Sequence, residues 1–206
     1  MKRIAILVAT LLLATAPAFS QIIPGAGYVN STFISGSNNY VQNGFYAGVS
    51  MDMKLSGLKG LSFLPGAYAS LISYASSDNF YGLVSGDEKS TEIDLTIPAY
   101  FKFTYGLSRD ARVFAYAGPS AQIGVIAKSY SKATTFLGSR ESTRDLFTGN
   151  SGLNRFNVLI GGGVGFGFSQ FSINVGYDYG LLNVYRGSRD SVINRANLHV
   201  GVSFAL

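Results

Sequence analysis

The chain has 206 residues, of which 47% are hydrophobic and only 13% carry a charge, against about 25% charged residues in an average globular domain. Glycine (25 residues) and the aromatic residues (13 Tyr and 15 Phe) are abundant, whereas cysteine and tryptophan are absent. The lack of cysteine excludes disulfides, cysteine-ligated metal sites and a thiol nucleophile, and a single histidine excludes an all-histidine metal cage. We therefore expect no metal and no cofactor.

Residues 1–20 have the three parts of a secretory signal peptide. A basic pair, Lys2 and Arg3, precedes the apolar stretch Ile4 to Leu13, and small residues lead to a predicted cleavage between Ser20 and Gln21. The alternative is a membrane anchor, but a spanning helix needs roughly 20 apolar residues. Cleavage would leave 14 of the 16 basic residues against 11 acidic ones in residues 21–206. A net charge of only +3 gives no reason to expect a nucleic-acid partner.

The rest of the chain alternates between apolar and polar side chains with a period of two. In residues 45–54 every odd position is apolar, and the positions between are mostly polar or small. Such alternation predicts a β-strand with one apolar and one polar face. The same pattern recurs at 92–105, 112–125, 155–168, 171–180 and 196–206, and two more segments, 25–34 and 62–74, are strand-like without a clear facing. Eight strands result.

Eight antiparallel strands can form a soluble barrel with an apolar interior or a membrane barrel with an apolar exterior. Most of these segments have 10 to 15 residues, enough to cross a bilayer, whereas ordinary strands have about five or six. Long polar connections (77–90, 127–154, 182–194) alternate with short ones (55–61, 106–111, 169–170). The sequence therefore predicts an all-β, eight-stranded antiparallel up-and-down transmembrane β-barrel over residues 21–206.

Aromatic residues gather at the strand ends on the apolar face. This placement is typical of the aromatic girdles of membrane barrels. The residues predicted to form the girdle at the periplasmic interface are Phe103, Tyr105, Phe166, Phe168, Phe171 and Phe204.

Several segments, in order along the chain, resemble the strands of the PorT-like outer-membrane β-barrel family of the porin type. These segments are 63–66 (FLPG), 95–102 (LTIPAYFK), 117–119 (AGP), 156–167 (FNVLIGGGVGFG) and 176–183 (GYDYGLLN). The resemblance implies an eight-stranded barrel in the outer membrane of a Gram-negative bacterium, reached after removal of the signal peptide. It implies no common catalytic residues.

The polar face of the strands predicts a charged lumen. An eight-stranded barrel is just wide enough for its own side chains to fill it, and buried charges must be paired or hydrogen-bonded. Inward glycines of the run 161–167 would leave room for the side chains opposite. We expect a structural polar network that plugs the lumen, formed by Asp52, Lys54, Glu92, Asp94, Lys102, Arg112, Arg155, Asp178 and His199.

The predicted function is a structural or surface-interaction role without enzymatic activity. Alternatives are a narrow channel for small solutes or ions, an accessory component of protein secretion, and a membrane enzyme that uses His199. Basic residues of the 127–154 connection could pair with lipopolysaccharide phosphates. The expected partners are therefore outer-membrane lipids and lipopolysaccharide, together with periplasmic chaperones and the barrel-assembly machinery, and the expected state is a monomer.

Overall fold

The computed structural model describes residues 21–36, 38–80, 84–135, 138–148, 152–187 and 192–206, so the predicted signal peptide lies outside the described residues. Among the described residues, no helix has the length and apolar character needed to cross a membrane. The regular elements are strands: β1 (Gln21–Ser35), β2 (Asn38–Lys54), β3 (Leu61–Phe80), β4 (Val84–Gly106), β5 (Ala111–Thr135), β6 (Gly138–Asp145), β7 (Phe156–Phe168), β8 (Phe171–Gly180) and β9 (Asn194–Phe204).

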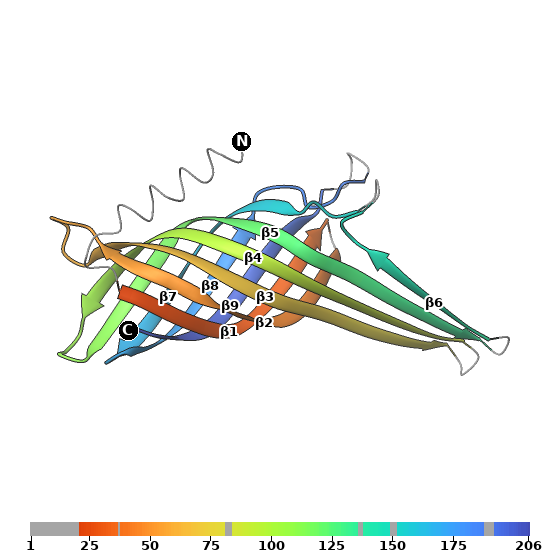
Figure 1. Ribbon diagram of the computed structural model, residues 1–206, viewed down its shortest axis with the longest axis horizontal. Helices are drawn as coiled ribbons and strands as arrows, with labels where there is room; N and C mark the ends of the chain where they lie inside the picture. The colour runs from red at the N-terminus through yellow and green to blue at the C-terminus, as the bar shows by residue number, and fades with distance from the viewer. Residues whose placement is uncertain (1–20, 37, 81–83, 136–137, 149–151, 188–191) are drawn as a thin grey trace.

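Eight of these strands form a closed antiparallel ring (Figure 1). Strands that follow one another in the chain pair around the wall, except that β5 pairs with β7, and the ring closes where β1 pairs with β9. β6 lies outside the ring and pairs only with the far end of β5. The predicted eight-stranded barrel is confirmed, and each predicted strand segment corresponds to one strand of the ring.

The two ends of the barrel differ. The turns 55–60, 107–110 and 169–170 lie at one end, together with the start of β1 and the end of β9. We call it the short-turn end. The opposite end, the long-loop end, carries the connections from β3 to β4, from β5 to β7 and from β8 to β9.

The outer face of the barrel is apolar and the inner face is polar. Phe45, Val164 and Val202 are 70%, 57% and 58% exposed on the outside, whereas Ser120 and Asn157 are buried inside. A soluble barrel would have the reverse arrangement, because apolar surface is buried away from water. The apolar outer face is therefore suited to hydrocarbon.

The structure also gives the facing of the two segments for which the sequence pattern is ambiguous. On β1 the odd residues Val29, Ser31 and Phe33 are buried, and on β3 the even residues Ser70 and Ile72 are buried. Both inner faces mix apolar and polar residues. This mixture is why alternation alone does not reveal which side faces the lumen.

Two of the connections predicted as long polar loops are largely strand. β3, β4 and β5 have 20, 23 and 25 residues and continue beyond the barrel wall. With β6 they form a four-stranded extension at the long-loop end (Figure 1). A ladder that starts in the barrel wall can continue through Ser-, Thr- and Tyr-containing segments, because the backbone groups stay paired whether or not an apolar face is present. The loop prediction for 77–90 and 127–154 is therefore wrong for the described residues.

A β-bulge in β5 changes which side chains face outward in this extension. Ile93 pairs with Ile126 but Asp94 pairs with Gly124, so Val125 is the extra residue. An extra residue reverses the facing of everything that follows it. Before the bulge even residues of β5 face inward, and after it the odd residue Ala127 is buried. Lys128 consequently points away from the barrel axis.

Candidate functional site

The lumen is blocked toward the long-loop end by a buried cluster of three charged residues, Arg195, Glu92 and Asp94. The guanidinium of Arg195 on β9 lies 2.8 Å from Glu92 Oε1 and 2.8 Å from Asp94 Oδ2 on β4. The same guanidinium donates a hydrogen bond of 2.7 Å to Ser31 Oγ and stacks on the Phe33 ring at 5.1 Å. The side chains of the three charged residues are at most 7% exposed. We call this group the Arg195 cluster.

The surroundings of the Arg195 cluster leave almost no free volume. Gln122 donates a hydrogen bond of 3.2 Å to Asp94 Oδ2, and Ile72 and Leu159 nearby in the interior are 1% and 0% exposed. The space beside the cluster measures about 10 Å³. A space of this size holds one water molecule at most, so the described side chains pack closely at this level of the lumen.

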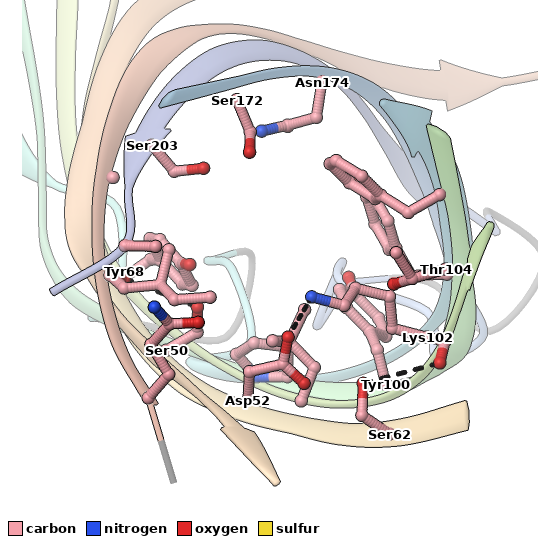
Figure 2. Close-up of a pocket in the computed structure, with 18 of the residues that line it drawn as sticks. Ser50, Asp52, Ser62, Tyr68, Tyr100, Lys102, Thr104, Ser172, Asn174 and Ser203 are labelled. Carbon is pink, nitrogen blue, oxygen red and sulfur yellow. Dashed lines mark hydrogen bonds and ion pairs between the residues drawn. The ribbon is translucent and has the colours of Figure 1, made fainter. Parts of the chain in front are cut away.

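The half of the lumen toward the short-turn end is hollow. A cavity of about 840 Å³ extends from Ile72 and Gln122 to the turn residues Gly57 and Gly60. Figure 2 shows its wall, with side chains such as Ser50, Asn174 and Ser203 arranged around an open centre. The prediction that side chains fill the whole lumen is therefore wrong for this half.

Tyrosine side chains of the cavity wall lie over glycines of other strands, where no side chain competes for the space. Tyr116 lies over Gly163 and Gly176, where an added Cβ would come within 2.5 Å of the Tyr116 hydroxyl. Tyr46 covers Gly201 in the same way. The inward glycines thus make room for rings from strands one or two places away around the barrel.

A chain of four polar side chains in contact forms part of the cavity wall. Tyr100 donates to Asp178 Oδ1 at 2.6 Å, and His199 Nδ1 lies 3.5 Å from Asp178 Oδ2. The other ring nitrogen of His199, Nε2, is 3.1 Å from the Tyr116 hydroxyl. The groups come from β4, β5, β8 and β9, so the chain links four strands across the inner wall. Its polar groups use one another as partners.

The structure divides the predicted polar network among several places. Glu92 and Asp94 belong to the Arg195 cluster, and Asp178 and His199 to the chain just described. Asp52 and Lys102 form an ion pair on the cavity wall (Figure 2). At the short-turn mouth of the cavity, Lys54 is exposed, and Arg112 donates to the Ser169 carbonyl oxygen (2.6 Å) and to Ser172 Oγ (3.4 Å).

Arg155 is a correction to the predicted network. It precedes the first residue of β7, is exposed, and donates hydrogen bonds to the carbonyl oxygens of Gly124 and Val125 at 3.3 and 3.0 Å. Its guanidinium stacks on the Phe147 ring at 4.5 Å. Because β7 begins at Phe156, the alternation that turns its odd residues inward does not apply to Arg155.

The predicted girdle residues all lie on the outer face near the short-turn end. Phe171 and Phe204 pack against each other with ring centroids 5.0 Å apart. The exposed fractions of the other four rings, Phe103, Tyr105, Phe166 and Phe168, range from 41% to 61%. Their role as an interfacial girdle stays a prediction.

Arg195, the cation of the buried cluster, is not among the lumen residues predicted from the sequence. Arg195 stands one residue before the alternating segment that starts at Ala196, and its odd number matches the inward residues Asn197 and His199. Extending the alternation by one residue would have found it. The inward tyrosines Tyr100 and Tyr116 were also missed, although they lie on the polar parity of their strands.

We expect the purified barrel to show no steady conductance in planar bilayers, because the Arg195 cluster closes the lumen. Removing residues 131–142, the tip of the hairpin formed by β5 and β6, should leave the current absent, since the closure is inside the wall. A porin reconstituted in the same way serves as the positive control. Large, stable, ion-selective currents from the unmodified protein would contradict the closed lumen.

A closed ring of eight strands with an apolar outer face and a polar interior defines a transmembrane β-barrel. The family model described as "Outer membrane protein beta-barrel domain" matches residues 17–186. The chain belongs to this family of Gram-negative outer-membrane proteins. In such barrels the short turns face the periplasm, so the short-turn end is periplasmic and the long-loop end is extracellular.

The chain is also similar to solved outer-membrane proteins. Ail of Yersinia pestis, in complex with the heparin analogue sucrose octasulfate, is 12% identical with a TM-score of 0.49, covering 91% of this chain and 99% of Ail. Neisserial surface protein A is 13% identical with a TM-score of 0.43 (89% and 96% covered), and the outer-membrane enzyme PagL is 10% identical with a TM-score of 0.41 (86% and 98% covered). No curated protein matches the chain.

Proposed function

We propose that this protein is a closed outer-membrane barrel with a structural and surface-interaction role and no enzymatic activity, and that it reaches the membrane after cleavage between Ser20 and Gln21. The observation that carries the proposal is the four-stranded extension built by β3, β4, β5 and β6 beyond a lumen that the Arg195 cluster closes. The barrel wall anchors this polar sheet at the cell surface. The segments that resemble the PorT-like family support membership of that group.

The partner we propose at this surface is lipopolysaccharide. On the outer face of β4 and β5, the apolar belt reaches Ile93 and Ile126, and the next long side chains facing outward are Lys89 and Lys128. Both lysines are exposed. Cations just above an apolar belt lie at the level of lipid head groups, where they attract anionic lipid phosphates. Lys89 and Lys128 are therefore the residues most suited to contact lipid phosphates.

Two other charges of the extension are matched within the sheet. Lys132 and Glu141, opposite each other on β5 and β6, form an ion pair of 3.0 Å. Hydrogen bonds from Lys132 and Tyr130, together with the charge of Lys132, lower the pKa of Glu141. This cross-strand pair engages the Lys132 charge within the sheet, and the proposed lipid contact falls to Lys89 and Lys128, nearer the barrel.

The lipid contact is tested by reversing its charges. Lipopolysaccharide added to the detergent-solubilised protein should raise the thermal midpoint of the unmodified barrel, and this shift should be lost when Lys89 and Lys128 are both replaced by Glu. The matched control, Lys54→Glu with Lys59→Glu, changes two exposed lysines at the opposite end and should keep the shift. An equal shift in the Lys89 and Lys128 variant would contradict the proposed contact.

We further propose a monomer that depends on periplasmic chaperones and the barrel-assembly machinery. The pairing of β1 with β9 leaves no open edge in the barrel wall, so the ring needs no second copy to complete it. Before insertion, outward side chains such as Phe45 and Phe171 would be exposed to water. Apolar surface of this extent promotes aggregation, which is the reason for expecting chaperone partners.

A further inference from the structure

We propose that the lumen cavity is a binding site for a small anionic sugar, a sugar acid or a sugar phosphate, that enters from the periplasmic end. The cavity volume of about 840 Å³ lies within the range of about 300–1,000 Å³ typical of small-molecule sites. The Arg195 cluster closes the inner end, and residues of the turn between β2 and β3 line one side of the mouth. The cavity is therefore a blind pocket reached from one side.

The wall of the cavity combines aromatic faces with hydrogen-bonding groups. Tyr46 and Tyr68 contact each other edge to face, with ring centroids 5.9 Å apart. Small polar side chains complete the wall, among them Ser50, Ser172 and Asn174 (Figure 2). A sugar ring presents C–H groups on its faces and hydroxyls around its edge, and this wall offers partners for both. An acyl chain would leave the polar groups without partners, which costs free energy.

Two acceptor atoms on the wall need a hydrogen-bond donor. Asp52 Oδ1 and Asn197 Oδ1 are buried oxygens that have no hydrogen-bond partner in the structure, and both residues line the cavity. Asn197 is 93% buried. Buried polar groups are almost always paired, so these two oxygens call for donors that the wall itself does not supply. Both oxygens have almost no accessible surface, so a ligand or solvent donor reaches them only if neighbouring side chains move.

The charges that line the cavity favour an anion. Four cations, Lys54, Lys59, Lys102 and Arg112, stand against two carboxylates, Asp52 and Asp178. Asp52 is paired with Lys102, and Asp178 accepts a hydrogen bond from Tyr100 and lies close to His199. The remaining three cations lie at the mouth, where Lys54 and Lys59 are exposed. A cleft lined by one sign of charge concentrates ligands of the opposite sign.

The absence of cysteine makes a thiol-labelling test direct. Ser203→Cys places a single thiol on the cavity wall, and Ser142→Cys places one on the exposed β6 as the matched control. At each thiol we compare the modification rates of an anionic and a cationic methanethiosulfonate reagent. The ratio of the anionic rate to the cationic rate should be about tenfold higher at the cavity thiol than at the control thiol. Equal relative rates, or a faster cationic reagent, would overturn the anionic preference.

Galacturonate and its neutral counterpart galactose serve as the binding probes. Galacturonate at millimolar concentration should slow modification of the Ser203→Cys thiol and leave the Ser142→Cys thiol unaffected, and galactose should protect much less. Lack of protection by galacturonate, equal protection by galactose, or protection of both thiols would overturn the proposal.

Two further variants link the protection to the cavity itself. Lys54→Glu and Lys59→Glu, combined with Ser203→Cys in one variant, should abolish protection by galacturonate. Heat-modifiable migration in gels should be unchanged, which shows that the barrel still folds. Gly176→Ala should also abolish it, because the added Cβ would collide with His199 and displace the Tyr116 hydroxyl into the cavity. Undiminished protection in the folded double-lysine variant would overturn the role of the cationic mouth.

Discussion

Replacing Arg195 by methionine should destabilise the barrel by about 3 to 5 kcal/mol, because the change leaves two carboxylates in the interior without their cation. Glu92 and Asp94 are 5% and 1% exposed, and each has one oxygen 2.8 Å from the Arg195 guanidinium. Urea unfolding of the refolded protein in lipid vesicles, followed by heat-modifiable gel migration, measures the loss of free energy.

Two control variants separate the buried charge from other causes. Combining Arg195→Met with Glu92→Gln and Asp94→Asn removes the uncompensated charge, so most of the stability should return. Lys132→Met breaks the exposed pair with Glu141 and should cost at most about 1 kcal/mol. An Arg195→Met variant as stable as the unmodified barrel would show that the cluster does not depend on its cation.

The barrel could be predicted because every second residue of a membrane-spanning strand faces lipid and is therefore apolar. In β7, Val164, Phe166 and Phe168 face outward, and the residues between them are mostly glycine. A strand with such a pattern can place its apolar side only toward hydrocarbon or toward a soluble core. Strand length then decides between these two, since ordinary strands have about five or six residues.

The facing of β3 and the end of the charged network were not predictable from alternation. In residues 62–74, Leu64 and Ile72 share the polar parity with Ser62 and Ser70, because part of the inner wall is apolar. Arg155 follows the inward parity of β7 but lies outside the strand. Arg195, on the correct parity, lies at the edge of a strand where the pattern is weakest. The facing of β3 stayed open because its inner face mixes apolar and polar side chains, and Arg155 and Arg195 were misassigned or missed because they lie at strand boundaries.

The hollow lumen depends on pairing register, which one sequence does not contain. Tyr116 lies over Gly163 because β5 pairs with β7 in that register, and Gly176 follows because β7 pairs with β8. Shifting either pair by two residues would keep every side chain on its face and would place the ring over a different residue. The sequence shows that glycines and tyrosines face inward, but it does not show which of them meet.

Replacing Val200 by arginine should destabilise the barrel by about 2 to 4 kcal/mol, the cost of a guanidinium on the lipid face near the bilayer midplane. Val200 is 50% exposed on the outer face of β9, where it pairs with Tyr28 on one side and Val175 on the other. Gly201→Ser is an unsuitable inward control, because any Cβ at Gly201 collides with the Tyr46 hydroxyl. That substitution would report steric displacement of Tyr46 and not the polarity of the inner face.

Asn174→Arg is the matched control for the lipid face. Asn174 precedes Val175 on β8, lies at nearly the same depth as Val200, and lines the cavity. A guanidinium there reaches a polar space of about 840 Å³, so this change should cost far less than Val200→Arg. Urea unfolding in lipid vesicles gives both free energies on one scale. The two arginines lie at similar depth and differ in whether they contact hydrocarbon. Equal losses of stability would therefore contradict an apolar outer face and a polar inner face.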